Sequence, residues 1–300
     1  MRVESSIQSI RVLVTGATGK LGRLLVPRLL DQGVAVRALT RQAGPARSLL
    51  GPRVEVVQGN LGQPATLDAA LQGVTHLFLL SPIDPQLATC QGHAIAAAER
   101  AGVQRIVKLS GSAWTLAPAG RSLSGDLHAA VEAQLARSAI PHVVLQPNAW
   151  SQAVLGHGLA LLRAGSDLLA DPFAGARVSY IDARDIADVA VAALLGTGGD
   201  TPAEGQPWVL TGDQAVQAEE LAQWARAASG RPVRVQAALL PTAPDPSVPA
   251  FTAQVHAQFH QLIRAGQAQE VTTTVSRVLG RRPRTVAAWV AEQLAHPASP

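Results

Sequence analysis

Residues 12–22 read Val-Leu-Val-Thr-Gly-Ala-Thr-Gly-Lys-Leu-Gly. The β-branched run that ends at Thr15 is typical of a buried strand, and the apolar spacing after Lys20 predicts a helix over 21–30. Amides in the first turn of a helix have no partner within the helix and, together with the helix dipole, favour a phosphate. The segment therefore predicts a strand, a phosphate-binding turn and a helix.

The three glycines of this segment are spaced G-x-x-G-x-x-G rather than in the commoner G-x-G-x-x-G pattern. We expect Gly16 to allow a tight turn, Gly19 to let a pyrophosphate approach the backbone, and Gly22 to let the helix pack closely on the strand. A purely structural strand-to-helix turn would also contain such glycines. The residues predicted here to bind a cofactor are Gly16, Ala17, Thr18, Gly19, Lys20, Leu21 and Gly22.

The composition excludes several classes of protein. Cys90 is the single cysteine, so no internal disulfide can form and a reducing compartment fits. The first nine residues do not resemble a secretory leader, and no apolar run reaches the ~18 residues of a membrane span. Arginines are scattered and aromatic residues make up 3% of the chain, too few for a stacking groove, so we expect no nucleic-acid partner. The expected location is cytoplasmic.

Apolar runs alternate with helical patterns through the first half of the chain. The runs are continuous rather than alternating with polar residues, which is typical of a parallel sheet covered on both faces. The pattern predicts an α/β fold with a doubly wound parallel sheet of Rossmann type over residues 1–150. The expected strands after the first are 34–39, 53–57, 74–80, 104–109 and 142–146, and the expected helices are 65–71, 86–101 and 126–138.

The second half, residues 151–300, predicts a smaller C-terminal α/β lobe, with 177–196 returning to the Rossmann domain. The proline-rich segment 240–249 is expected to be irregular. The expected helices are 149–163, 182–195, 216–229, 250–266, 271–279 and 285–295, and the expected short strands are 177–180, 207–211 and 233–235.

Polar residues follow the predicted strands at their carboxyl ends, where doubly wound sheets bind ligands. This convergence favours a dinucleotide site over a structural glycine turn. Asn60 is also a common turn former, and Ser110 could simply end its strand. The further residues predicted to bind the cofactor are Arg41, Asn60, Leu61, Ser81, Pro147 and Asn148.

The residues after the second predicted strand indicate which dinucleotide binds. Sites that prefer NAD have a carboxylate about 20 residues past the glycines, whereas an arginine there accommodates the 2′-phosphate of NADP. This chain has Arg41 and no carboxylate over 34–50. A guanidinium can hold a phosphate by a charge-assisted fork, and Lys20 could add a second positive charge. The sequence predicts NADP(H) in preference to NAD(H), although both cations could also be plain exposed residues.

A set of motifs extends over nearly the whole chain and resembles the NmrA-like family of atypical short-chain dehydrogenases/reductases. The resemblance implies a Rossmann-type domain that binds NADP(H) or NAD(H). Some members of that family reduce quinones or azo compounds, and others are catalytically silent sensors that regulate a protein partner. The motifs are residues 12–22, Thr40-Arg41, Gly59-Asn60-Leu61, Val107-Lys108-Leu109-Ser110, 128–132, 145–150, 178–187 and 280–285.

The usual catalytic pair of the wider superfamily, Tyr-x-x-x-Lys, is missing. Tyr180 is the single tyrosine and Arg184 stands four residues later, in a segment that matches a strand-to-helix junction, so we expect Tyr180 to be structural. The resemblance puts a Lys or His near the nicotinamide where this chain has His128. Imidazole suits proton transfer near neutral pH, which makes His128 the first catalytic candidate and Ser110 the second. His128 could instead close the cleft without taking part in the chemistry.

These observations predict an NADP(H)-dependent reductase that transfers hydride to a flat electrophile such as a quinone, a small-molecule substrate. Trp114 and Trp150 could stack on that substrate or pack in the core. The alternative is a silent NAD(P)-sensing regulator with a protein partner. His256 and His260 have metal-ligand spacing but no third ligand, so no metal is predicted.

Overall fold

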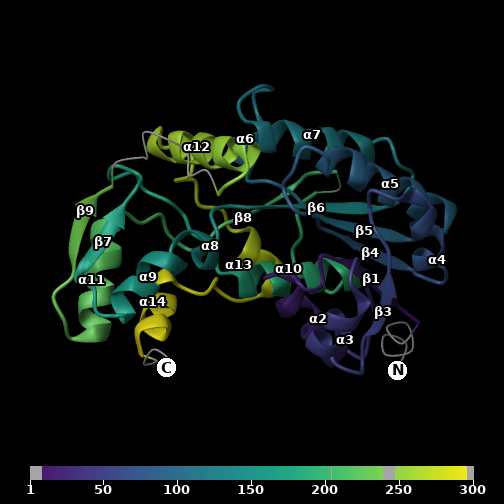
Figure 1. Cartoon of the computed structure of the whole chain (residues 1–300), viewed down its shortest axis with the longest axis horizontal. Helices are drawn as coiled ribbons and strands as arrows, with labels where there is room; N and C mark the ends of the chain where they lie inside the picture. Colours follow the sequence, from purple (N-terminus) through teal and green to yellow (C-terminus); the bar gives the residue numbers. More distant parts are fainter. Residues whose placement is uncertain (1–8, 204, 239–246, 296–300) are drawn as a thin grey trace.

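The computed structural model describes residues 9–203, 205–238 and 247–295 (Figure 1). Seven strands form one sheet in which every neighbouring pair is parallel, in the order β3-β2-β1-β4-β5-β6-β8. The doubly wound α/β fold predicted from the sequence is confirmed. The strands are β1 (Arg11–Thr15), β2 (Ala35–Thr40), β3 (Glu55–Gln58), β4 (His76–Leu79), β5 (Arg105–Leu109), β6 (His142–Pro147) and β8 (Trp208–Leu210).

Helices cover both faces of this sheet, and β1 shows why its sequence does not alternate. Val12 and Val14 pack into the cluster on one face and Leu13 into the cluster on the other, so all three are buried. The first face is covered by α2 (Gly22–Asp31), α3 (Ala43–Leu50), α10 (Ala183–Leu195) and α13 (Thr274–Leu279). The second is covered by α4 (Leu67–Leu71), which follows the short 3-10 turn Pro64–Thr66, and by α5 (Leu87–Arg100) and α7 (Leu123–Leu135).

A smaller lobe forms a separate apolar core around a two-stranded parallel sheet of β7 (Leu168–Asp171) and β9 (Arg234–Ala237). Leu159, Leu221 and Trp289 are among the residues that fill this core. Figure 1 shows this lobe beside the large sheet. Its helices are α8 (Ser151–Val154), α9 (Gly156–Arg163), α11 (Ala218–Ser229), α12 (Ala250–Arg264) and α14 (Val286–Ala295).

The large sheet takes more from the second half of the chain than residues 177–196. β8 pairs with β6 at the sheet edge, and Val275 and Val278 of α13 pack into the same cluster as α10. Asp185 of α10 is fully buried and accepts hydrogen bonds from Arg281 and Arg284, while Asp188 pairs with Arg28 of α2 at 2.6 Å. Through these ion pairs, α10 connects the segment after α13 with α2, the first helix of the fold.

Several local predictions are wrong. Residues 177–180 form no strand, because Val178 makes only a single antiparallel bridge to Val216 and the Ser179 amide donates to Ala268 instead. The helix expected over 149–163 is divided into α8 and α9. The helices α3 and α6 (Ala113–Leu116) and strand β7 were not predicted. Most of the proline-rich segment, 239–246, lies outside the described residues, and within the described residues no helix is long and apolar enough to cross a membrane.

Candidate functional site

The glycine turn after β1 leaves backbone donors free. Gly16 has φ of +66°, a conformation that glycine adopts without strain, and its carbonyl accepts the Gly19 amide at 3.0 Å. Among the described residues, no backbone acceptor faces the amides of Lys20, Leu21 or Gly22 at the start of α2. These donors and the helix dipole form a site for an anion.

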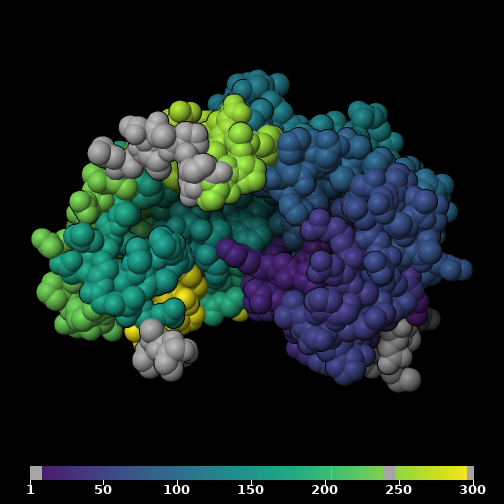
Figure 2. Space-filling view, viewed as in Figure 1, coloured from purple at the N-terminus to yellow at the C-terminus, as the bar shows by residue number. Residues whose placement is uncertain are grey.

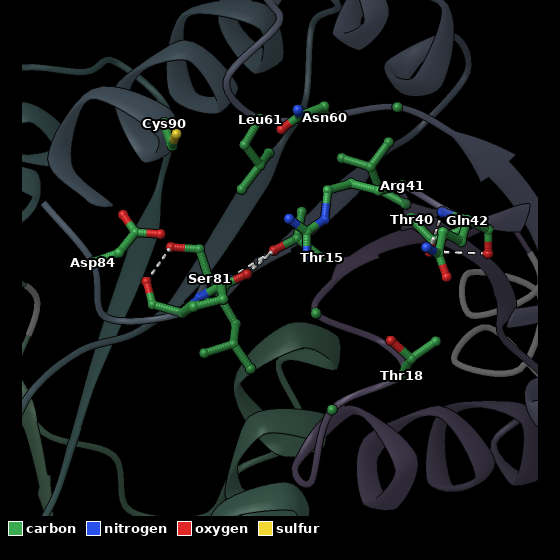
Figure 3. Close-up of a pocket in the computed structure, with 16 residues that line it drawn as sticks. Thr15, Thr18, Thr40, Arg41, Gln42, Asn60, Leu61, Ser81, Asp84 and Cys90 are labelled. Atoms are coloured by element: carbon green, nitrogen blue, oxygen red, sulfur yellow. Dashed lines mark hydrogen bonds between the residues drawn. The ribbon is translucent and has the colours of Figure 1, made fainter. Parts of the chain in front are cut away.

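A cleft of about 720 Å³ opens above this turn at the carboxyl ends of the strands (Figure 3). It brings together seven of the residues predicted to bind the cofactor: Gly16, Thr18, Gly19, Arg41, Asn60, Leu61 and Ser81. The residues that complete its lining are Thr15, Leu39, Thr40, Gln42, Gly59, Leu80, Pro82, Asp84 and Cys90. Figure 2 shows the molecule hollowed between its two halves, below the yellow-green helix α12.

Arg41 supplies the positive charge of the cleft. It follows β2 directly, and Figure 3 shows its side chain extending into the pocket. Its guanidinium makes no ion pair with any residue of the described chain. Lys20 is exposed at the start of α2 and does not line the cleft. An unpaired guanidinium at this point fits a phosphate group.

Asn60 forms a turn and also lines the cleft. Its Oδ1 accepts the Gly62 amide at 3.0 Å, which closes a turn, while the residue also lines the cleft. Another part of the rim, at the end of β4, is held by side-chain hydrogen bonds. The Thr15 hydroxyl donates to the Leu80 carbonyl at 2.7 Å, and Ser81 Oγ accepts from Gln91 at 2.9 Å.

Asn148 and Pro147 lie at the end of β6, outside the lining of this cleft. Asn148 Oδ1 accepts from Trp114 Nε1 at 2.8 Å and from the Ala149 amide at 2.7 Å. Its Nδ2 donates to Ser179 and to the Ala268 carbonyl. All four hydrogen-bonding positions of this amide are used within the protein, so its side chain joins the large sheet to the smaller lobe.

The two catalytic candidates belong to a buried polar cluster at the ends of β5 and β6. Ser110 Oγ donates to Glu132 of α7, and Gln146 Nε2 donates to both Glu132 oxygens at 3.1 and 3.0 Å. Because the Ser110 proton is directed at a carboxylate, this hydroxyl has only its lone pairs left for another partner. Ser110 directly follows β5 as Ser81 follows the paired strand β4, so the backbone at Ser110 lies about one strand spacing, ~5 Å, from the cleft rim.

His128 is paired with Lys108, which sequence reasoning overlooked as a site residue. The two side chains meet at 3.1 Å between Lys108 Nζ and His128 Nδ1, and both are buried. Burial lowers the pKa of Lys108 to about 7. Burial, reinforced by the Lys108 charge, holds the pKa of His128 well below its ordinary value. The ordinary titration range of imidazole, on which His128 was chosen as a candidate, therefore does not apply to this buried ring.

The sequence does contain a signal for Lys108. A lysine inside the apolar strand run Ile106-Val107-Lys108-Leu109 lies where a doubly covered sheet has no solvent, and lysine is almost never fully buried unless it has a partner. That conflict between residue type and position points to a functional pair. The partner on α7 could not be read from the sequence, since it depends on how α7 packs on β5.

The remaining candidates occupy packed positions. Trp114 contacts Phe259 of α12 with ring centroids 4.9 Å apart, which closes α6 against α12. Tyr180 is buried in the smaller lobe's core, and burial raises its pKa. His260 packs edge-on against Phe173 at 5.4 Å. Within the described residues, no group of three or more His, Cys, Asp or Glu side chains could hold a metal ion.

Comparison with known proteins gives consistent likenesses. A sequence model described as NAD(P)H-binding matches residues 16–196. The NAD(P)H azoreductase of Xenophilus azovorans is 34% identical over 280 residues, which is 92% of this chain and 95% of the azoreductase. The NADPH complex of the Escherichia coli quinone oxidoreductase QOR2 superposes with a TM-score of 0.79 at 26% identity, covering 94% of this chain and 99% of that one.

The NmrA resemblance of the motifs is confirmed at the level of the fold. A mutant NmrA superposes with a TM-score of 0.75 over 95% of each chain, at 17% identity. The chain is also similar to two reductases, the azoreductase and QOR2, and the sequence motifs had indicated a resemblance to reductases of this kind.

Proposed function

The chain belongs to the NAD(P)H-binding family, and on that premise we propose that it is an NADPH-dependent reductase that passes a hydride to a flat electrophile such as a quinone or an azo compound. The observation that carries the proposal is the cleft at the strand ends, where an unpaired arginine lies beside the glycine turn that leads to the free amides at the start of α2. The azoreductase and quinone oxidoreductase relatives support the substrate class. A cytoplasmic location, favoured by the single cysteine, is part of the same proposal.

The cleft and the glycine turn that borders it fit a dinucleotide. The amides of Lys20, Leu21 and Gly22 would hold the pyrophosphate, and Gly19 keeps the approach open because it carries no side chain. Arg41 would pair with the 2′-phosphate, which makes NADP(H) the preferred cofactor over NAD(H). Asn60, Leu61 and Ser81 would line the nucleoside walls. Contacts from Ala17, Pro147 and Asn148 stay predictions.

NADPH supplies the hydride when it is bound. The chain's own part is to hold the acceptor beside the ends of β5 and β6 and to provide a proton for the anion that reduction creates. Within the cluster at these strand ends, His128 is the proposed donor, because Ser110 directs its hydroxyl proton to Glu132. A quinone suits this weakly acidic site, since hydride addition gives a delocalised phenolate that needs little help from an acid.

The direct test measures binding and turnover separately. NADPH and NADH are titrated by fluorescence, and absorbance loss of NADPH is then followed with a panel of small quinones and azo compounds. We expect submillimolar NADPH binding and oxidation by at least one acceptor. Absence of binding contradicts the proposal, and binding without oxidation by any acceptor favours the silent sensor with a protein partner.

The role of His128 is tested by His128→Ala. Loss of a positioned proton donor is expected to lower turnover with a quinone by about 10- to 100-fold while the NADPH dissociation constant stays within about twofold. His256→Ala is the matched control, because His256 is exposed on α12. Full quinone turnover by the His128 variant would remove this residue from the mechanism.

A further inference from the structure

The surroundings of Lys108 restrict what its ammonium can do. The residue lies in β5 between Leu79 of β4 and Val144 of β6, and its side chain is 0% exposed. Among the described residues, Nζ has two hydrogen-bond partners, the Leu109 carbonyl at 3.1 Å and His128 Nδ1 at 3.1 Å. A buried cation that makes so few bonds is costly to the fold, so its presence calls for a role beyond packing.

The charge state of Lys108 decides which nitrogen of His128 carries the proton. An ammonium can only donate, so Nδ1 of a neutral imidazole must accept from it, and the ring proton is then on Nε2. A Cβ at Gly111 would lie 2.9 Å from His128 Cδ2. Because Cδ2 is bonded to Nε2, the edge of the ring that bears Nε2 lies against the loop at the end of β5, away from Lys108.

We propose that Lys108 is a positioning residue that keeps the His128 proton on Nε2 and replaces it when Nε2 gives it to the reduced acceptor. In this step the Nε2–H bond breaks and an O–H or N–H bond forms on the acceptor that has just received hydride. One Nζ–H bond breaks, Nδ1–H forms, and Lys108 becomes a neutral amine. After product release, Nε2 takes up one proton from bulk solvent and the Nδ1 proton returns to Nζ, so each turnover consumes one solvent proton. The inference rests on the proposed reductase function.

Lys108 supplies the acidity that His128 lacks. A neutral imidazole is by itself a very weak acid, and the low pKa of His128 keeps it neutral at pH 7. Burial lowers the pKa of Lys108 to about 7. Because Lys108 passes its proton to His128, the pair acts as an acid whose pKa is matched to neutral pH. Glu132 of α7 is the acidic group whose charge opposes this lowering, and the strand neighbours Leu79 and Val144 are apolar.

A double-mutant cycle tests the coupling. Lys108→Met, His128→Ala and the double variant are compared with the wild type for quinone turnover at saturating NADPH, from about pH 5.5 to about pH 9. We expect Lys108→Met to lower turnover about tenfold. In the wild type, turnover falls as pH rises above about 7, where Lys108 loses its proton. This limb should be absent in Lys108→Met, and Lys108→Met should have no further effect in the His128→Ala background. Unchanged turnover and pH profile, or equal losses in both backgrounds, overturns the proposal.

A second measurement needs neither a variant of Lys108 nor turnover. In protein labelled with ¹⁵N-histidine and saturated with NADPH, the His128 signals are assigned by their absence from His128→Ala. At about pH 6 we expect a proton on Nε2 and none on Nδ1. A proton on Nδ1 at that pH overturns the proposal. Failure of the reductase function would appear separately, as NADPH binding without oxidation by any acceptor.

Discussion

The Cβ position of Gly22 lies 2.4 Å from the carbonyl oxygen of Gly16, so the start of α2 touches the backbone of the turn that precedes it. The neighbouring atoms of Ala17 are also backbone, at 2.5 Å. Gly19 is different, because its Cβ would meet only the Gly16 carbonyl, at 3.2 Å. The two glycines of one motif therefore differ in their packing: a side chain at Gly22 would meet backbone on several sides, whereas one at Gly19 would meet a single carbonyl.

Substitution of these two glycines should separate stability from cofactor affinity. Gly22→Ala must displace backbone, and we expect a loss of about 3 kcal/mol or more in the free energy of unfolding. Gly19→Ala should lower the free energy of unfolding by less than about 1 kcal/mol. It should raise the dissociation constant of NADPH at least tenfold, since its methyl group enters the path of the pyrophosphate. Denaturant unfolding and NADPH titration measure the two effects. A stable Gly22→Ala protein would refute the close-packing argument.

Arg41→Ala tests which cofactor the cleft prefers. We expect the dissociation constant of NADPH to rise by about 10- to 100-fold, which is the value of a charge-assisted phosphate contact. The dissociation constant of NADH should change by less than about twofold. Arg47→Ala is the control, because Arg47 is exposed on α3 and does not line the cleft. Fluorescence titration at low and high salt gives the dissociation constants. Equal weakening of both cofactors would show that Arg41 does not contact the 2′-phosphate.

Arg284→Ala should destabilise the fold through Asp185. That carboxylate is 0% exposed and has two charged partners, Arg281 and Arg284. In the variant only the ion pair with Arg281 would remain. We expect the free energy of unfolding to fall by about 2–3 kcal/mol, because a buried charge is left short of partners. Arg100→Ala, which removes an exposed pair with Asp68, should change it by less than about 0.5 kcal/mol. Similar values for both variants would contradict a structural role for the buried charges.

Acid should weaken the fold before its carboxylates titrate. Burial lowers the pKa of His76 to about 4, so between its ordinary value near 6.5 and 4 the unfolded chain binds a proton that the folded chain does not. Stability is therefore full above pH 6.5 and falls as the pH drops toward 4. Burial lowers the pKa of His128 and His260 in the same direction, whereas Asp182 and Asp188 act only at lower pH.

The share of His76 in this loss is tested by His76→Gln. We expect the fall in unfolding free energy between about pH 6.5 and about pH 4 to shrink by about 1 kcal/mol after allowance for solvent screening. Urea unfolding at a series of pH values gives the slope. His142→Gln is the control, because His142 is only half-buried at the start of β6. An unchanged slope for His76→Gln would show that His76 takes up its proton in the folded state.

The sheet could be predicted from the sequence because each strand is a short apolar run buried on both faces, as Val12, Leu13 and Val14 show. Elements whose stability depends on distant partners were harder to predict. α6 is only four residues long, and its Trp114 is held by Asn148 and Phe259, which lie far along the chain. Residues 177–180 have strand-like composition, yet Val178 finds only one bridging partner.

The same distinction applies to the site. That Gly16, Gly19 and Arg41 line one cleft could be predicted because their placement follows from local backbone geometry and from their position at strand ends. The protonation state of His128 could not be predicted, because it depends on burial under α7 and on a lysine from another element. Local spacing therefore identified residues that line the cleft, whereas tertiary packing determines the charge state of His128.

The contribution of β8 and α13 to the large sheet has a consequence for folding during synthesis. The ribosome synthesises the glycine turn early, whereas β8 at residues 208–210 and the arginines at 281 and 284 are synthesised much later. Before these segments are synthesised, the outer edge of β6 lacks its paired strand and the buried face of α10 lacks the side chains of α13 that pack on it. A nascent chain of this protein therefore carries an incomplete large sheet until residue 284 has been translated.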